Sequence, residues 1–160
     1  SLVGIMATKL NARLVAGLFD IKDSIPDSLQ DVKKQLDEKG IVVCGALGVQ
    51  PNMTSDGDAA QIAQYLKASI FVNLTNVDGL YDKDPRKFKK AKLTEYISYN
   101  DFLATVFRIK YEAGQHFVLD QAAAKIISKA KMKTLIINGK KLENFDNYLK
   151  NKNFVGTLIA

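Results

Sequence analysis

Four short apolar runs, separated by segments with helical periodicity, most limit the folds open to this 160-residue chain. Each run is rich in aliphatic residues and lacks polar–apolar alternation, as is typical of strands buried on both faces. The intervening segments place apolar residues three and four positions apart, like helices that cover a sheet. The pattern predicts an α/β three-layer sandwich with a largely parallel central sheet. The runs are IVVCGA (41–46), SIFVNL (69–74), KTLIIN (133–138) and GTLIA (156–160).

Six segments are expected to be helical. In the first, large apolar residues recur every four positions from Met6 to Leu18, on one side of the helix. Ser28 is suited to cap the second helix at its start, and Gly40 is suited to end it. The expected helices span residues 4–19, 29–39, 57–68, 100–107, 121–131 and 142–151.

The length fits one domain, expected to span residues 1–160, with a core of its own. No apolar run approaches the roughly 18 residues of a membrane span, and no signal peptide is recognisable.

The single cysteine, Cys44, allows no internal disulfide and suits a reducing cytoplasm. With His116 as the only histidine, the chain has too few ligands for zinc, and no nucleophile motif surrounds His116. No metal site built from protein groups alone is expected.

The net charge of +6 raises the question of nucleic-acid binding. The lysines are spread over several segments, however, without interleaved aromatic residues or a known binding motif. We therefore expect a solvated basic face and no nucleic-acid partner. Such a face would also favour a polyphosphate ligand.

The segment TNVDGLYDKDP (75–85) directly follows the apolar run at 69–74 and contains several turn-forming residues. It therefore leaves the strand at its carboxyl end, which is the edge where open α/β sheets bind ligands. A plain polar surface turn is the alternative for such a segment. Its carbonyl groups, Thr75, Asp78, Asp84 and the ring of Tyr81 would suit a nucleoside accompanied by hydrated Mg²⁺.

A second loop, VQPNMTSD (49–56), also follows an apolar run and leads into a helix. It places Thr54, Ser55 and Asp56 at the helix N-terminus, where free backbone amides and the helix dipole favour a phosphate. Simple capping of the helix is the alternative role for the hydroxyl groups. A functional Asp56 would orient cationic groups, because a carboxylate repels phosphate.

Five motifs occur in order from Gly4 to Ile159: GIMATKLNA, TSDGDAAQIA, TNVDGLYDKDPRK, GQHFVLDQAAAKII and VGTLI. As an ordered set they resemble the uridylate (UMP) kinases of the amino-acid-kinase fold, most closely the archaeal type. The resemblance implies phosphoryl transfer from ATP, with Mg²⁺, to UMP. It also implies a homo-oligomer, a hexamer in this family, in which the first helix contributes to the dimer contact.

By the same resemblance, Asp56 organises the catalytic lysines. Asp78 and Gly79 are expected to shape the turn, because Gly79 can adopt a positive φ. The positions expected to hold ATP are Thr75, Asn76, Tyr81 and Asp84, and those expected to cradle UMP are Val49, Gln50, Pro51, Asn52, Met53, Thr54 and Ser55.

The chain departs from the family pattern in three respects. Asn52 and Met53 stand where the family has glycine and histidine, and Ser55 replaces its second threonine. Ser1 stands where the family has an aspartate that binds the ribose of UMP. The family's N-terminal strand, with its lysine and glycine-rich phosphate loops, is not among residues 1–160, so this segment alone is not expected to catalyse.

Two other functions stay open at this point. The altered loop QPNMTSD (50–56) is compatible with a kinase of the same fold that uses a different small acceptor. The start at Ser1 is compatible with a non-catalytic nucleotide-binding or regulatory protein. A lysine and a glycine-rich turn upstream of Ser1 would favour the kinase.

Overall fold

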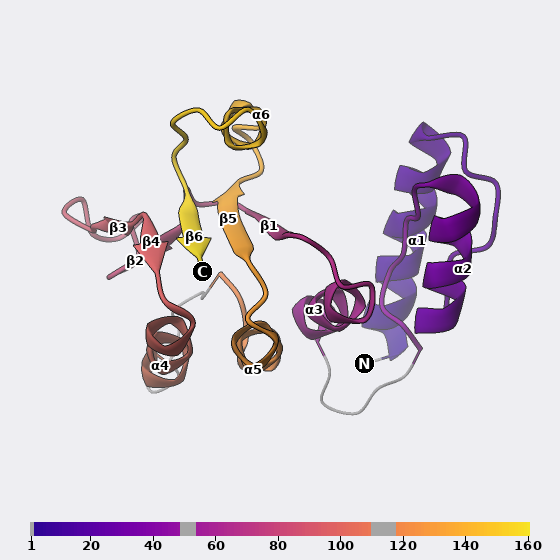
Figure 1. Ribbon diagram of the computed structural model, residues 1–160, viewed down its shortest axis with the longest axis horizontal. Coiled ribbons are helices and arrows are strands. Elements are labelled where there is room, and N and C mark those ends of the chain that lie inside the picture. The colour runs from indigo at the N-terminus through magenta and orange to yellow at the C-terminus, as the bar shows by residue number, and fades with distance from the viewer. Residues whose placement is uncertain (1, 49–53, 110–117) are drawn as a thin grey trace.

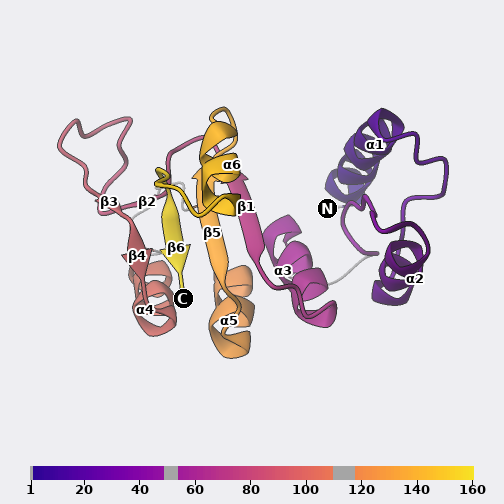
Figure 2. The same ribbon diagram turned by 45° about the horizontal axis from the view of Figure 1, so that its top comes forward.

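The computed structural model describes residues 2–48, 54–109 and 118–160, and all structural statements below concern these residues. A sheet with helices on both faces forms one part of the molecule, and two paired helices lie beyond it (Figures 1 and 2). The helices are α1 (Leu2–Leu18), α2 (Leu29–Lys39), α3 (Ser55–Tyr65), α4 (Tyr99–Ile109), α5 (Gln121–Ala130) and α6 (Glu143–Leu149). The strands are β1 (Phe71–Thr75), β2 (Leu80–Tyr81), β3 (Leu93–Thr94), β4 (Tyr96–Ile97), β5 (Thr134–Asn138) and β6 (Thr157–Ile159).

The main sheet has the strand order β1-β5-β6-β4. Strand β1 runs parallel to β5, with Phe71 opposite Thr134, and β4 runs parallel to β6. The central pair, β5 and β6, is antiparallel. The predicted α/β class is therefore confirmed, with a mixed sheet in which two of the three strand pairings are parallel.

The side chains of β5 show how the sheet is covered on both faces. Ile136 and Ile159 belong to the main core, which α3, α4 and α5 complete from one side (Figure 1). Leu135 and Ile137 are fully buried too, and strand geometry directs them to the opposite face, where α6 lies. Burial on both faces explains why this strand reads as a continuous apolar run.

The strand predicted at residues 41–46 does not form, because the described part of the chain offers this run no neighbouring strand. The run lies along α1 instead. The amide of Ala46 donates to the Thr8 hydroxyl at 3.0 Å, and a Cβ on Gly45 would fall 2.8 Å from the Thr8 backbone. Apolar content alone was therefore insufficient to predict a strand, since a strand also needs a partner for its backbone groups.

Helix α1 turns its small residues inward. Ala12 and Ala16 are buried, whereas the large apolar residues that recur from Met6 to Leu18 are exposed. The predicted apolar side of the helix therefore exists but faces solvent.

No described helix is long and apolar enough to cross a membrane. The predicted caps of α2 are confirmed: Ser28 accepts from the Asp31 amide, and Gly40 has a φ of 73°.

Asp58 is a buried acid in the first turn of α3, with only 6% of its surface exposed. The Leu47 amide donates to its carboxylate, which ties residues 41–47 to the helix. Its Oδ1 atom has no hydrogen-bond partner among the described residues. Burial raises the pKa of Asp58, and the Leu47 hydrogen bond only partly opposes this shift.

We expect Asp58→Asn to stabilise the protein at neutral pH by about 1 kcal/mol or more, because the neutral amide avoids the free-energy cost of burying a charged carboxylate. The folded-state pKa of Asp58 is raised, so the parent loses stability as pH rises through and above the ordinary value of 3.8. The stability difference should therefore grow with pH and vanish in acid. Chemical denaturation of both proteins across this pH range would measure it, and a pH-independent difference would contradict the assignment.

Candidate functional site

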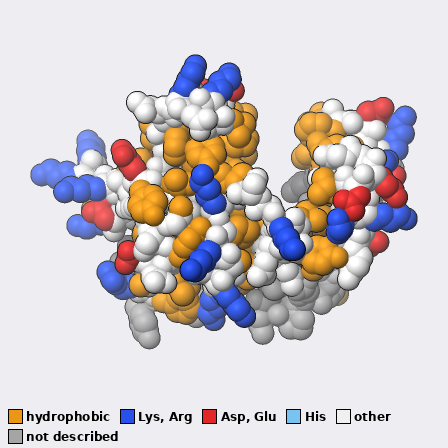
Figure 3. All heavy atoms as spheres, viewed as in Figure 1, with side chains coloured by type: hydrophobic (Ala, Val, Ile, Leu, Met, Phe, Trp, Pro, Cys, Tyr) orange, Lys and Arg blue, Asp and Glu red, His pale blue; other side chains and the backbone are white. Residues whose placement is uncertain are grey.

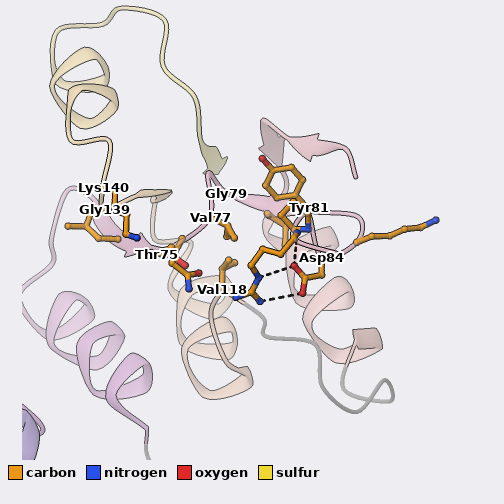
Figure 4. Close-up of a pocket in the computed structure, with 14 residues that line it drawn as sticks. Thr75, Val77, Gly79, Tyr81, Asp84, Val118, Gly139 and Lys140 are labelled. Atoms are coloured by element: carbon orange, nitrogen blue, oxygen red, sulfur yellow. Dashed lines mark hydrogen bonds and ion pairs between the residues drawn. The ribbon is translucent and has the colours of Figure 1, made fainter. Parts of the chain in front are cut away.

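A cavity of about 530 Å³ opens at the carboxyl ends of β1 and β5 (Figure 4). The two strands are parallel, so the segments that follow them, beginning with Asn76 and Gly139, meet at the same edge of the sheet. The structure brings all four residues predicted to hold ATP to this cavity, where they form part of its lining. They are Thr75, Asn76, Tyr81 and Asp84.

Asp78 fixes the turn that forms one wall of the cavity. Its carboxylate accepts from Asn138 Nδ2 at 2.9 Å and pairs with Lys141 Nζ at 3.0 Å. These contacts with Asn138 and Lys141 lower the pKa of Asp78. The aspartate therefore joins the turn after β1 to the end of β5, and this structural role accounts for its position.

Gly79 does not adopt the positive φ expected from the sequence; among the described glycines only Gly40 and Gly48 do. Space is the reason for glycine here, because a Cβ at this position would lie 2.5 Å from Thr157 Oγ1. The Thr157 hydroxyl accepts from the Leu80 amide at 2.8 Å and donates to the Thr94 carbonyl at 2.6 Å. The turn can therefore pack against β6 only without a side chain at residue 79.

Asp84 is held by Arg86 at the wall of the cavity. The Arg86 guanidinium lies 3.1 Å and 3.3 Å from the two carboxylate oxygens, and its backbone amide donates at 3.0 Å (Figure 4). These bonds lower the pKa of Asp84. Nearby, burial and the charge of Asp78 raise the pKa of Tyr81, so its hydroxyl stays protonated at neutral pH.

The N-termini of α3 and α5 meet close to this cavity. Thr54 caps α3 by accepting from the Gly57 amide at 3.1 Å, and its hydroxyl donates to the carboxylate of Asp120. Asp120 in turn caps α5 by accepting from the Ala123 amide at 2.9 Å. Val118, two residues before Asp120, lines the cavity, so the paired helix ends adjoin it.

Asp56 lies beside this junction, half-buried in the first turn of α3. Burial raises the pKa of Asp56, and the nearby Asp120 charge adds to the shift, while a hydrogen bond from the Asp120 backbone amide opposes it. Two neighbouring carboxylates of this kind favour a cation between them. The location of Asp56 therefore suits the predicted task of orienting cationic groups.

The remaining predicted residues lie away from this cavity or outside the described part of the chain. Val49, Gln50, Pro51, Asn52 and Met53 lie outside the described residues. Ser55 does not line the cavity at the sheet edge. It lines a second cavity of about 420 Å³ between α1 and α3, which is mainly apolar and also contacts residues 43–46.

Sequence reasoning did not assign functional roles to Val118, Asp120, Gly139, Lys140 and Arg86. The signal for Gly139 and Lys140 was present, because they directly follow an apolar run in the same way as Thr75 and Asn76 do. Asp120 directly precedes a helical pattern, as a capping residue should. Its contact with Thr54, 66 residues away in sequence, could be found only from the fold.

Residues 1–138 match the Amino acid kinase family. The chain is 33% identical to the uridylate kinase of Sulfolobus acidocaldarius, with 99% of the chain and 70% of that protein covered. It is 38% identical to the uridylate kinase of Methanococcus aeolicus, with 86% of the chain and 61% of that protein covered. The matched region is thus well under the full length of either relative.

Solved structures give the same result. Uridylate kinase from Archaeoglobus fulgidus matches with a TM-score of 0.83 and 34% identity, over 99% of this chain and 71% of that one. UMP kinase from Ureaplasma parvum matches with a TM-score of 0.76 and 25% identity, over 99% of this chain and 69% of that one.

Proposed function

The chain belongs to the amino acid kinase family, where its relatives are uridylate kinases, and from this premise we propose that it forms the nucleotide-binding part of a UMP kinase. Such an enzyme transfers the terminal phosphoryl group of ATP to UMP and releases UDP and ADP. The observation that carries the proposal is the cavity at the sheet edge. It is lined by the four residues that the resemblance to the family assigns to ATP.

ATP is proposed to occupy this cavity. Thr75 and Asn76 offer a hydroxyl and an amide directly after β1, and Tyr81 offers a flat ring. Lys140 adds a cation from the turn after β5, and it has no ion pair among the described residues. A cavity with a few converging polar groups on an otherwise apolar lining is typical of nucleotide and cofactor sites.

UMP is proposed to bind at the N-terminus of α3, through the loop of residues 49–55. Thr54 and Ser55 lie at the helix N-terminus, where the Gly57 amide is used by the Thr54 cap and the dipole and remaining first-turn amides favour a phosphate. The junction between α3 and α5 adjoins the ATP cavity through Val118. The acceptor phosphate would therefore face the terminal phosphate of ATP, as direct transfer requires.

Phosphoryl transfer needs positioning and charge neutralisation, and no covalent nucleophile on the protein is required. Asp56 and Asp120 can hold cationic groups at the junction of α3 and α5. They also fit Mg²⁺, which uses one or two carboxylates together with phosphate oxygens and water. Mg²⁺ would neutralise charge on the phosphates of ATP. The described residues contain no cluster of three or more acidic, histidine or cysteine ligands.

The proposal includes a homo-oligomer that contacts its copies through α1. Leu10, Leu14 and Leu18 leave 65–85% of their surface exposed on one side of this helix. A continuous apolar face of this kind favours burial against another protein surface.

The single cysteine of the sequence permits no internal disulfide, which suits the reducing cytoplasm where we place the enzyme.

Asp84→Asn is expected to raise the ATP concentration for half-maximal activity several-fold while leaving the fold intact. The change removes the carboxylate charge proposed to contact ATP or its Mg²⁺ at the cavity wall. Steady-state kinetics of the full-length gene product would measure the effect. Asp37→Asn is the matched control, because Asp37 is also ion-paired but lies on α2 at the other end of the molecule (Figure 1). An unchanged ATP dependence in Asp84→Asn would count against the assignment.

A further inference from the structure

The loop that connects β2 to β3, residues 82–92, concentrates positive charge; we refer to it as the basic loop. Six cationic side chains and two carboxylates give it a net charge of +4, out of +6 for the whole chain. These eleven residues thus hold two-thirds of the net charge of the protein. The cationic residues are Lys83, Arg86, Lys87, Lys89, Lys90 and Lys92.

Both carboxylates of the basic loop are used to fold it. Asp84 binds Arg86, as described above, and Asp82 accepts a hydrogen bond from the Lys92 amide at 2.7 Å. The Asp82 amide donates in return to the Lys92 carbonyl at 3.1 Å. The five lysines of the loop are exposed and form no ion pair within the described part of the chain. Their charge is therefore available to a ligand.

The basic loop forms part of the rim of the ATP cavity. Lys83 and Arg86 line the cavity, and the loop continues outward from there. The space-filling view shows several Lys and Arg side chains projecting from the end of the molecule that carries β2 and β3 (Figures 1 and 3). An anion that approaches the cavity from this side meets the lysines before it reaches the binding residues.

The composition of the loop favours a small polyanion over a nucleic acid. Its one aromatic residue, Phe88, is half-exposed, and the Lys83 ammonium lies 5.9 Å from the ring centroid. Single-stranded nucleic acids usually bind to several aromatic rings that stack on successive bases. A lone phenylalanine covered by a lysine provides no such surface.

We propose that the basic loop guides nucleoside triphosphates electrostatically into the cavity. This proposal rests on the proposed function as a nucleotide-dependent kinase. Attraction over several ångströms grows with the charge of the ligand, so a triphosphate gains more than a monophosphate. The attraction is screened by salt, with a Debye length of about 10 Å at 0.1 M ionic strength. The loop would thus accelerate ATP binding and favour ATP over UMP at this entrance.

The test is stopped-flow binding of a fluorescent ATP analogue to the full-length protein over a range of salt concentrations. Lys89→Gln with Lys90→Gln removes two charges that do not line the cavity, so the contacts of bound nucleotide persist. We expect association at low salt to slow by about threefold, a modest share of the full effect of electrostatic steering. The two rates should converge at high salt, and dissociation should stay unchanged.

The matched control is Lys33→Gln with Lys34→Gln, an adjacent lysine pair on α2 at the opposite end of the molecule (Figure 1). It changes the net charge equally and should bind like the parent. An equal slowing in the control, or a change confined to dissociation, would overturn the guidance role. Unchanged ATP association together with lost binding of a single-stranded RNA would assign the loop to nucleic acid instead. A parent protein that takes up no nucleotide would overturn the proposed function as well.

Discussion

Gly79→Ala is expected to lower the free energy of unfolding by about 2–4 kcal/mol and to abolish nucleotide binding. The new Cβ would lie 2.5 Å from Thr157 Oγ1 and 2.9 Å from Leu93 Cδ1, too close for either contact. Overpacking of this kind costs about 1–3 kcal/mol, and the loss of one of the two Thr157 hydrogen bonds adds about 1 kcal/mol. Movement of the turn would also displace Tyr81 and Asp84 from the cavity wall.

Thermal unfolding and equilibrium nucleotide binding would measure both effects. Gly17→Ala is the matched control, because a Cβ at that helical position meets nothing within 4 Å. It should leave the protein unchanged or more stable by up to about 1 kcal/mol, as alanine is favoured over glycine in helices. If Gly79→Ala behaved like this control, the turn would not pack against Thr157 as described.

The double variant Thr54→Ala with Ser55→Ala should raise the UMP concentration for half-maximal activity by about tenfold or more. Two hydrogen bonds to a charged phosphate, at about 1.5 kcal/mol each, exceed the energy that a tenfold change requires. ATP dependence should change little, because Thr54 and Ser55 do not line the ATP cavity. Steady-state kinetics with each substrate varied in turn would separate the two effects.

Capping must be distinguished from phosphate binding, since Thr54 also caps α3. Removing a cap costs about 1 kcal/mol of stability, so the double variant should also unfold at a lower temperature. Thr54→Ser alone keeps the hydroxyl and should retain both the cap and the affinity for UMP. Ser28→Ala removes the equivalent cap of α2 and should lower stability without affecting UMP. Normal UMP affinity in the double variant would exclude this loop as the phosphate site.

Local sequence signals correctly predicted those elements whose structure depends on residues close together in the sequence. The strand β5 was recognisable because burial on both faces requires continuous apolar residues. Strand β1 was recognisable from its apolar run as well, although it lies at the sheet edge, is only partly buried and leaves Leu74 exposed. The cap of α2 was recognisable from Ser28 and Gly40. Residues 41–46 had the same apolar signal but no strand beside them in the described part of the chain, and the sequence does not state which segments become neighbours. The two-residue strands β2, β3 and β4 are too short to show any periodicity.

The same distinction applies to the site. Thr75, Asn76, Tyr81 and Asp84 are close in sequence and follow one strand, so a rule about strand ends placed their segment at the ligand-binding edge, and the family resemblance selected these four residues for ATP. Asp120 reaches the site through its contact with Thr54, and Lys140 reaches it through the pairing of β1 with β5. The reason for Gly79 was also tertiary, because its close neighbour Thr157 lies 78 residues further along the chain.

The most direct test is an acceptor assay with the full-length gene product, ATP and Mg²⁺. The acceptors would be UMP, CMP, AMP and a phosphorylated compound without a nucleobase, and the products would be separated and quantified. We expect UDP to form much faster than any other product, and Gly79→Ala to abolish its formation in parallel with nucleotide binding. Faster transfer to another acceptor, or nucleotide binding without transfer to any of them, would contradict the assignment as a UMP kinase.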